Sequence, residues 1–369
     1  MNTEKTDFSI RSLIKTLLFG VLIISCDNSS SETKFSREVI INERADFEKV
    51  NIQLKTTVFE QFLKPTKITH TDDYIVVSDR ATPKLMHLIR KSDLTYLGQF
   101  GGIGQGPKEV SLVFDFKRPL RPNEIIVNSI GDRRIAFFDL SNPKIKESNE
   151  LNIQPDSILQ YAFINSEIVY FEFSNQNSFI STPITKKEKF HEIDIASHET
   201  VNSWGTWEGM LEDPKTPSSI TISVFQGQLK TNKIRSKFGY ATLYWDFIEI
   251  LDLDDNSWLR LVGPDNLDHN YSIDYSPGYP MHSIGEGNKL GYIDLFLGSE
   301  LIFGLYSGMP DRGAHGREII IFDYKGKPVK IIAFDKPVDS FNVDEANQKI
   351  YLLSREGENT GIGVYDYDF

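Results

Sequence analysis

A six-residue pattern of hydrophobic and polar positions occurs four times along the chain. Its order is apolar, any residue, apolar, apolar, Asp, apolar, and its copies are Ile135–Leu140, Ile248–Leu253, Ile319–Tyr324 and Ile362–Tyr367. Runs rich in Ile, Phe, Val and Tyr suit a half-buried strand, and an Asp at the end can accept a backbone hydrogen bond two residues on and begin a turn. Repetition every few tens of residues indicates a solenoid or a propeller.

A polar turn followed by an apolar run defines a second strand in most of these repeats. The runs are Tyr74–Val77, Ile125–Val127, Ile168–Phe171, Leu301–Phe303 and Ile350–Leu353. Each indicates a hairpin that leads into a strand. Two weaker copies of the six-residue pattern, Met86–Lys91 and Ile180–Thr185, bring the number of repeats to six, about 45 to 70 residues apart. Common propeller blades recur every ~40 to 50 residues.

The pattern therefore predicts an all-β protein, a six-bladed β-propeller of four-stranded antiparallel blades. Residues 190–250 match the repeat least well, and a seventh blade in that region is the alternative. Ile220–Val224 within it is interpreted as a strand of a divergent blade that carries an insertion. The last pattern ends near Phe369 and leaves its blade without an outer strand. Glu38–Asn42 or Val50–Leu54 is expected to supply that strand and to protect the open edge.

The first 25 residues have the pattern of an export signal. Three basic residues precede Leu17–Ile24, an apolar run of eight residues that is too short to cross ~30 Å of hydrocarbon as a helix. Ser25 and Cys26 follow, and this ending resembles the lipobox of bacterial lipoproteins, in which the cysteine is acylated. A buried, unmodified Cys26 is the alternative. We predict a lipoprotein signal peptide at 1–25, a flexible tether at 26–37 and the propeller at 38–369, exported and lipid-anchored to the cell membrane or outer membrane.

Composition limits the partners of the chain. It has 40 Lys and Arg against 52 Asp and Glu, a formal net charge of −12 at pH 7. Such an acidic body lacks the basic stripe that phosphate backbones require, so no nucleic-acid partner is expected. Cys26 is the only cysteine, so the fold depends on its core and not on disulfides within the chain. We expect a monomer whose membrane contact is the acyl anchor.

Several segments together resemble a known family. Leu97–Val110 is close to the G-x-G-x-GP-x-E-hydrophobic loop that follows the first blade of certain propellers, and Ile320–Pro328, Asp335–Val338 and Val343–Tyr351 match their ending. The chain thus resembles the TolB-like six-bladed β-propeller lipoproteins, which are similar in style to NHL-repeat propellers. The resemblance covers about residues 50–369. It implies the fold and no activity, because most members lack an assigned one.

The glycine-rich loop does not have the spacing of a nucleotide-binding motif. Gly102, Gly104 and Gly106 depart from G-x-G-x-x-G, and the residues after Pro107 indicate a strand where a dinucleotide site needs the start of a helix. We interpret the loop as a connection between blades whose glycines allow positive φ.

An Asp-Arg pair precedes the six-residue pattern in three repeats. The pairs are Asp79-Arg80, Asp132-Arg133 and Asp311-Arg312. The turns between second and third strands of a propeller share one face near the central channel, so three guanidiniums could clamp a carboxylate or sulfate there while the aspartates orient them. The other interpretation is an Asp turn whose Arg pairs with the neighbouring blade.

The seven histidines show no local metal-binding spacing. His282 and His315 lie in predicted loops near the Asp-Arg pairs and are the histidines we assign to the candidate binding site, with surface or turn positions as the alternative. No cofactor is predicted. A propeller can also assemble a divalent-metal site from one side chain per blade, and such a metal in the central channel stays open.

Aromatic side chains gather in the divergent middle of the chain, and they include Trp204, Trp207, Trp245, Trp258, Tyr271, Tyr275 and Tyr279. Exposed rings could stack on a sugar, and core packing is the alternative.

Two classes of function remain open. The first is a membrane-tethered, non-catalytic binding module for a protein, peptide or glycan ligand. The second is a metal-dependent propeller hydrolase or lyase with its site in the central channel. Three or more His, Asp or Glu side chains within metal-binding distance would favour the enzyme, whereas Arg and aromatic groups at the channel mouth would favour binding. We predict the binding module.

Overall fold

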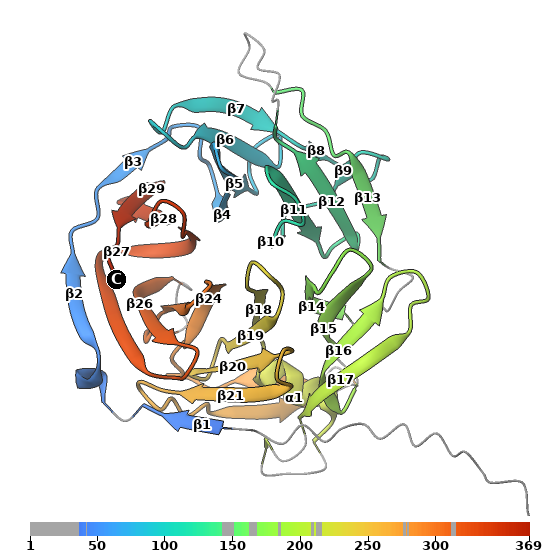
Figure 1. Ribbon diagram of the computed structural model, residues 1–369, viewed down its shortest axis with the longest axis vertical. Coiled ribbons are helices and arrows are strands. Elements are labelled where there is room, and N and C mark those ends of the chain that lie inside the picture. The colour runs from blue at the N-terminus through green and yellow to red at the C-terminus, as the bar shows by residue number, and fades with distance from the viewer. Residues whose placement is uncertain are drawn as a thin grey trace, which may run out of the picture. The chain divides into compact units, whose positions relative to one another are not determined.

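Strands dominate the computed structural model, which describes residues 37–41, 43–141, 151–161, 168–183, 186–207, 210–211, 216–275, 278, 280–310 and 315–369 (Figure 1). The helical elements within these residues are α1 (Ser218–Val224) and the 3-10 turn η2 (Arg44–Asp46). Neither of them has the length and apolar character of a membrane-crossing helix.

The described strands form six blades around a central axis (Figure 1). From the axis outward, blade 1 is β4 (Pro65–His70), β5 (Tyr74–Asp79), β6 (Met86–Arg90) and β7 (Tyr96–Phe100), and blade 2 is β10 (Asp115–Lys117), β11 (Glu124–Ser129), β12 (Arg134–Asp139) and β13 (Ser157–Gln160). Blade 3 is β14 (Ile168–Phe173), β15 (Ser178–Pro183), β16 (Glu188–Asp194) and β17 (Thr200–Thr206), and blade 4 is β18 (Gly227–Thr231), β19 (Lys237–Thr242), β20 (Phe247–Asp252) and β21 (Ser257–Val262). Blade 5 begins with β24 (Tyr292–Leu297), β25 (Leu301–Tyr306) and β26 (Gly316–Asp323). The predicted all-β propeller with six antiparallel blades is confirmed, and residues 190–250 contain no seventh blade in their described part.

One long strand joins blades 5 and 6. β27 (Pro328–Asp344) pairs with β26 through its first half, as in Ile332 with Ile319, and with β28 (Lys349–Glu356) through its second half, as in Val343 with Ile350. It is therefore the outer strand of blade 5 and the inner strand of blade 6. Pro337 lies in the irregular stretch between Ala333 and Val338, where the register of the β26–β27 ladder shifts and a proline is tolerated.

The ring is closed by a strand near the N-terminus, but not by either of the two candidates. β3 (Thr56–Val58) pairs antiparallel with β29 (Asn359–Asp366), the third strand of blade 6. The predicted segments pair elsewhere: β1 (Arg37–Ile40) runs parallel to β21 of blade 4, and β2 (Glu48–Ile52) runs parallel to β27 on blade 5. The prediction of closure from this region is confirmed and the choice of strand is wrong, because the blade edges compete for three short apolar segments that local sequence does not distinguish.

The six-residue pattern marks the third strand of its blade. It falls on β12, β20, β26 and β29, and its weak copy Met86–Lys91 falls on β6. As predicted, the closing Asp starts a turn: Asp139, Asp252 and Asp323 accept the backbone N–H of Ser141, Asp254 and Lys325 at 2.8–3.1 Å. Second strands such as β5 are buried on both faces because each blade is packed between two others, and Ile75, Val76 and Val77 are all 0% exposed.

Blade 3 is out of phase with the prediction by one strand. Ile180–Thr185 was expected to be its third strand, but Ser178–Pro183 is the second strand, β15, and Ile168–Phe173 is the first. The third strand is β16, which ends in Asp194, the acceptor for the N–H of Ala196 at 3.0 Å. Glu192 stands where the other repeats have an apolar residue and hides the pattern.

The expected strand at Ile220–Val224 is a helix. α1 follows Pro217 and lies in an insertion between β17 and β18. Ile220, Ile222 and Val224 are at most 6% exposed and belong to one core cluster with Trp207. Burial against the neighbouring blade thus overrides the strand preference of a β-branched run.

The glycine-rich loop connects blades 1 and 2, as predicted. Its short strands β8 (Gly102–Ile103) and β9 (Glu109–Val110) pair in parallel. The Glu109 carboxylate accepts the N–H of Gly106 at 3.0 Å, and a Cβ on Gly104, at φ +157, would lie 2.1 Å from that carboxylate. The glycines therefore make room for a side chain of the loop itself.

Candidate binding site in the central channel

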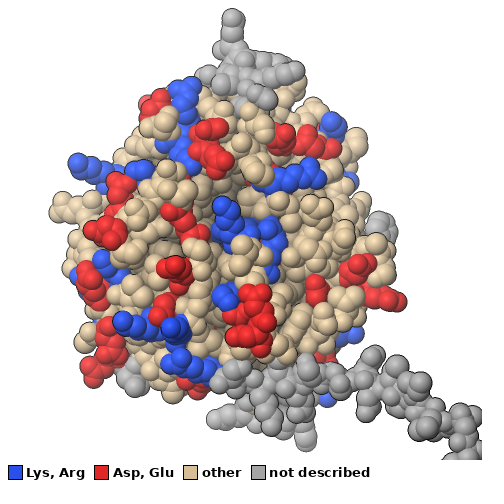
Figure 2. Space-filling view, viewed as in Figure 1, with Lys and Arg blue, Asp and Glu red and all other residues tan. Residues whose placement is uncertain are grey.

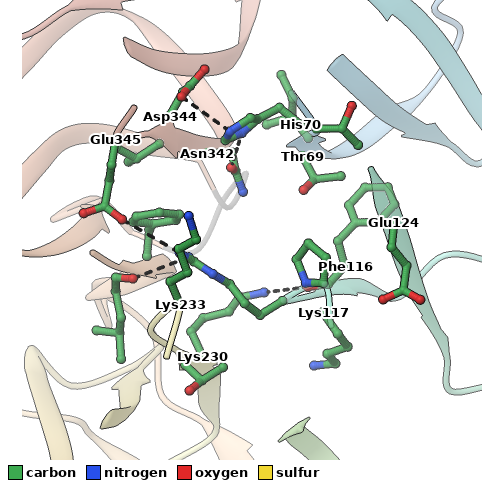
Figure 3. A pocket seen from close by; sticks show the side chains of 18 of the residues that line it. Thr69, His70, Phe116, Lys117, Glu124, Lys230, Lys233, Asn342, Asp344 and Glu345 are labelled. Atoms are coloured by element: carbon green, nitrogen blue, oxygen red, sulfur yellow. Dashed lines mark hydrogen bonds and ion pairs between the residues drawn. The ribbon is translucent and has the colours of Figure 1, made fainter. Parts of the chain in front are cut away.

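The mouth of the central channel contains a cavity of about 390 Å³ (Figure 3). The inner strands of all six blades and the turns after them line it. Its charged residues are Lys67, Lys117, Arg118, Arg121, Lys230, Lys233 and Arg235, and Asp72, Asp115, Glu124, Glu172, Asp294, Asp344 and Glu345. The lining is thus balanced in a chain that is acidic as a whole, and Figure 2 shows Lys and Arg side chains around the hollow at the centre of the ring, beside a group of Asp and Glu.

Asp115 is the centre of one buried charge network. Lys230 Nζ lies 2.7 Å from both of its carboxylate oxygens, and Lys117 Nζ lies 2.9 Å from one of them. Burial raises the pKa of Asp115, but the two ammonium groups outweigh it and the net shift is downward. The same pairing raises the pKa of Lys230 despite its burial. Asp115 and Lys230 therefore stay ionised and hold each other in place.

A second network joins the inner strands on the other side of the channel. Lys67 Nζ on β4 lies 3.2 Å from Asp294 Oδ2 on β24, and Ser340 on β27 donates its hydroxyl to the same oxygen at 2.8 Å. The Asp115 network joins the inner strands of blades 2 and 4, and these contacts join those of blades 1, 5 and 6, so both link blades across the channel through polar groups. Networks of this kind make the wall of the cavity rigid.

Glu172 on β14 is a buried carboxyl group with an unused acceptor. Its Oε2 accepts the backbone N–H of Arg118 at 3.2 Å. Its Oε1 has no hydrogen-bond donor within the described part of the chain, and Lys117 Nζ is 3.9 Å away. Burial raises the pKa of this carboxyl. Because Glu172 lines the cavity, a ligand donor can satisfy Oε1.

His70 lies beside the cavity in a neutral state. Its Nδ1 is 2.7 Å from Asn342 Oδ1, and its Nε2 is 4.0 Å from Asp344, which in turn pairs with Lys91 at 2.8 Å (Figure 3). Burial lowers the pKa of His70 to about 4. The ring is therefore a polar wall residue near pH 7 and not a cation.

Arg118, in the turn after β10, points its guanidinium at few acceptors. Within the described residues it donates one long hydrogen bond, to the Leu297 carbonyl at 3.4 Å, and lies 3.8 Å from Glu345. The group sits over the Phe296 ring at 4.8 Å, and its side chain is 17% exposed. It is held in position by stacking, with most of its donors available.

Arg235 and Lys233 come from the turn after β18. Arg235 donates to the Lys233 carbonyl at 3.2 Å and to the Arg118 carbonyl at 3.3 Å, and it also donates to Pro119. Its Nε is buried and has no acceptor among the described residues. Lys233 is exposed and pairs with no described acidic residue. These hydrogen bonds hold the Arg235 guanidinium against the backbone of Arg118 and Pro119, and Arg118, Lys233 and Arg235 all line the cavity.

The Asp-Arg pair of blade 1 lies at the other end of the channel. Asp79 pairs with Pro65 at the start of β4, whereas His70 at the end of β4 lines the cavity. Asp79 is 3% exposed and accepts backbone N–H groups from Leu63, Lys64 and Ala81 at 2.8–3.0 Å. Its carboxylate therefore fastens the chain that enters blade 1.

The Asp-Arg pair of blade 2 has a similar place. Asp132 accepts the N–H of Ser111, which precedes β10, at 2.9 Å, and Arg133 takes a positive φ of 52° in the turn. Asp311 and Arg312 lie outside the described residues. A binding role for the three pairs remains a prediction, and the two that are described share a structural one.

The predicted histidines do not line the cavity. His282 is on β23 (Met281–Ile284), which forms a hairpin with β22 (Tyr271–Asp274). Its Nε2 is 2.9 Å from His269 Nε2 and its Nδ1 is 3.3 Å from Ser223 Oγ. His315 directly precedes β26, and Cys26 lies outside the described residues. In the described part of the chain, no three His, Cys, Asp or Glu side chains are grouped so that they could hold a metal ion.

Three of the seven aromatic residues considered for sugar stacking are buried core residues. Trp204, Trp207 and Trp258 are 9%, 3% and 2% exposed and pack between blades 3 and 4. Tyr275 is 61% exposed but is not part of the cavity wall. Tyr279 lies outside the described residues. The aromatic cluster is thus explained mainly by packing.

Comparison with known protein families shows which family the chain belongs to. Residues 44–346 match the model of the TolB-like 6-blade propeller-like family, which is well over half of the sequence. This chain belongs to that family. No curated protein sequence matches it.

Three solved structures resemble the chain at low sequence identity, and the first of them shares its fold. A predicted exported protein (BF0058) from Bacteroides fragilis NCTC 9343 is 12% identical over 89% of this chain and all of its own, with a TM-score of 0.51. The structure of U3-55K is 11% identical over 88% of this chain and all of its own, with a TM-score of 0.44. The WD40 repeats of RRP9 are 11% identical over 88% of this chain and 98% of their own, with a TM-score of 0.42.

Proposed function

We propose that this protein is an exported lipoprotein whose propeller is a non-catalytic binding module, with a peptide segment of a partner protein bound at the mouth of the central channel. One observation carries the proposal, namely a cavity of about 390 Å³ lined by charged side chains from the inner strands of all six blades. Concave sites with a few fixed polar groups are the usual ligand sites of folded proteins.

The chemistry of the wall supports binding over catalysis. Lys67, Lys230 and Asp115 are paired with one another or with neighbours, so their charges are neutralised within the wall. A general base works best when its pKa is near the operating pH, so His70, the histidine of the cavity wall, is poorly suited to that role because burial lowers its pKa to about 4. Among the described residues that line the cavity, no three His, Cys, Asp or Glu side chains are grouped so that they could bind a metal ion.

A peptide suits this lining better than a sugar does. The mouth presents equal numbers of basic and acidic side chains, which can meet the charges and backbone groups of a peptide. Sugar sites usually offer an exposed ring for stacking, but the tryptophans of this chain are largely buried between blades 3 and 4. Phe296 in the cavity is covered by the Arg118 guanidinium.

The test is a selection of random displayed peptides on the full-length protein, followed by affinity measurements. Ala346 is an exposed residue of the cavity rim, and Ala81 is an exposed alanine in a turn at the other end of the channel. We expect Ala346→Trp to weaken the selected peptides at least tenfold and Ala81→Trp to leave their affinity unchanged. Equal effects of the two variants, or selected peptides that neither affects, would contradict the channel site.

The lipid anchor is a separate part of the proposal and has its own test. The basic and apolar segment before Cys26 supports acylation of that thiol after export. Metabolic labelling with a fatty-acid analogue should mark the wild-type protein and should not mark Cys26→Ser, which should leave the detergent phase for the aqueous phase. Label that persists on Cys26→Ser would show that the anchor is elsewhere.

A further inference from the structure

The edge of the channel mouth formed by blades 2 and 4 carries positive groups whose donors are only partly used within the described residues. We propose that Arg118, Arg235 and Lys233 bind a carboxylate of the ligand. This inference rests on the proposed function, because it assigns the chemistry of the same site. The sequence suggested that the arginines of the Asp-Arg pairs form such a clamp. Arg118, Arg235 and Lys233 are different residues, and they lie at the opposite end of the channel.

The first argument is the state of the Arg118 guanidinium. A guanidinium has five N–H donors in a planar fork, and the described contacts of Arg118 are one hydrogen bond of 3.4 Å and an acidic neighbour at 3.8 Å. Stacking on Phe296 fixes the plane of the fork before any ligand arrives. A carboxylate can accept two parallel hydrogen bonds from such a fork.

The second argument is the unsatisfied donor of Arg235. Its Nε is buried and has no acceptor among the described residues. A buried donor without an acceptor lowers the stability of a folded protein. The two guanidiniums influence each other: burial lowers the pKa of Arg118, and the charge of Arg235 lowers it further against the opposing effect of Glu345 and Glu172. A bound anion relieves the repulsion between the two guanidiniums.

The neighbouring carboxylates limit what kind of anion fits. Glu345 Oε1 already accepts the N–H and the hydroxyl of Ser299 at 2.6 and 2.8 Å, and Glu172 Oε2 accepts a backbone N–H. These acids remain close to the site and repel a doubly charged phosphate more than a singly charged carboxylate. The C-terminal carboxylate of a peptide, or an Asp or Glu side chain, has the required shape and charge.

Calorimetric titration of the full-length protein with succinate, against sodium chloride of equal ionic strength, tests the carboxylate site without any peptide. We expect saturable succinate binding that Arg118→Gln and Arg235→Gln each weaken at least fivefold. Arg80→Gln is the matched control, because Arg80 is an exposed arginine at the other end of the channel. Loss of binding in Arg80→Gln but not in Arg118→Gln would overturn the proposal and favour the Asp-Arg pairs.

Arg118→Lys separates the fork from the charge. It should also weaken succinate, because an ammonium cannot make the bidentate contact, and wild-type affinity in this variant would refute the clamp. Sulfate that binds as tightly as succinate would refute the preference for a carboxylate. Circular dichroism of each variant identifies loss of fold, and Lys233→Gln, at an exposed position, provides a variant that retains the fold. If succinate binds as expected while Ala346→Trp fails to affect selected peptides, the carboxylate site stands and the peptide function falls.

Discussion

The contribution of the closing segment to stability can be tested at Leu54, which lies between β2 and β3. Its side chain is 3% exposed and packs against Gly363 of β29, where an added Cβ would lie 2.7 Å from Leu54 Cδ1. Its N–H donates to Asp335 Oδ1 at 2.8 Å, and its carbonyl accepts from Lys336 Nζ at 2.9 Å. These backbone contacts persist in Leu54→Ala, so the substitution isolates the side chain.

The expected loss follows from the atoms removed. Leu54→Ala deletes three buried carbons, which at ~0.8 kcal/mol each gives roughly 2.4 kcal/mol of lost transfer free energy. A residual cavity adds to this, and measured Leu→Ala losses run from about 2 to 5 kcal/mol. Because the closing segment lies at the outside of the ring and can partly collapse onto it, we expect the free energy of unfolding to fall by about 3 kcal/mol.

Urea denaturation followed by tryptophan fluorescence measures this loss of stability with probes that lie away from the substituted residue. Trp204, Trp207 and Trp258 are buried between blades 3 and 4, whereas Leu54 packs on Gly363 of blade 6. A lower urea midpoint with an unchanged slope would show that closure stabilises the ring as one cooperative unit. Leu63→Ala is the control, since Leu63 is 63% exposed, and its effect should stay within about 0.5 kcal/mol. If Leu54→Ala is no more destabilising than Leu63→Ala, the reasoning about closure is wrong.

Three further substitutions test other parts of the structure. Asp79→Ala removes the acceptor for three backbone N–H groups and should lower the free energy of unfolding by about 3 kcal/mol; a loss below 1 kcal/mol in the same urea assay would contradict the fastening role. Lys189→Met removes one partner of the buried Glu249 carboxylate, which lies 2.7 Å from Lys189 Nζ, and should lower the free energy of unfolding by about 3 kcal/mol. Lys349→Ala, which breaks the exposed ion pair with Asp366, should lower it by less than about 1 kcal/mol. Burial lowers the pKa of His269 to about 4. Between pH 6.5 and 4 the unfolded chain therefore binds a proton that the folded chain does not bind. The free energy of unfolding falls as the pH is lowered through that window, by at most about 3 kcal/mol for this group. The difference between urea midpoints at pH 7.5 and 5 should therefore shrink in His269→Gln, and an unchanged difference would refute this assignment.

The blade repeat could be predicted because its signals are local. Asp139, Asp252 and Asp323 each accept a hydrogen bond from a backbone N–H two residues on, so the strand end and its turn are specified within a few residues. In blade 3 the prediction assigned the strands one position too early, and the reason is also local. Glu192 interrupts the apolar positions of β16, so the pattern of the third strand is not recognisable there. At Ile220–Val224 the strand preference itself misled, since packing around Trp207 decides the conformation there.

The candidate site could not be assembled from local patterns. Sequence spacing singled out Asp-Arg pairs, and the two that are described turned out to flank the ends of second strands, away from the cavity. One usable signal was present: Asp115, Lys117 and Arg118 place charges in and directly after a short strand that the repeat requires to be innermost. Charged groups in an inner strand of a propeller are expected to face the channel, because the other faces of the blade are packed.

By itself, the sequence determined most of the blade strands, the turns between them and the number of repeats, because each depends on residues close together in the chain. The tertiary structure decided which N-terminal strand closes the ring and which charges meet in the channel. Lys230 and Asp115 are 115 residues apart in sequence, and Lys67 and Asp294 are 227 apart. Only the closure of six blades around one axis brings such pairs within hydrogen-bond distance, and no local pattern records that geometry.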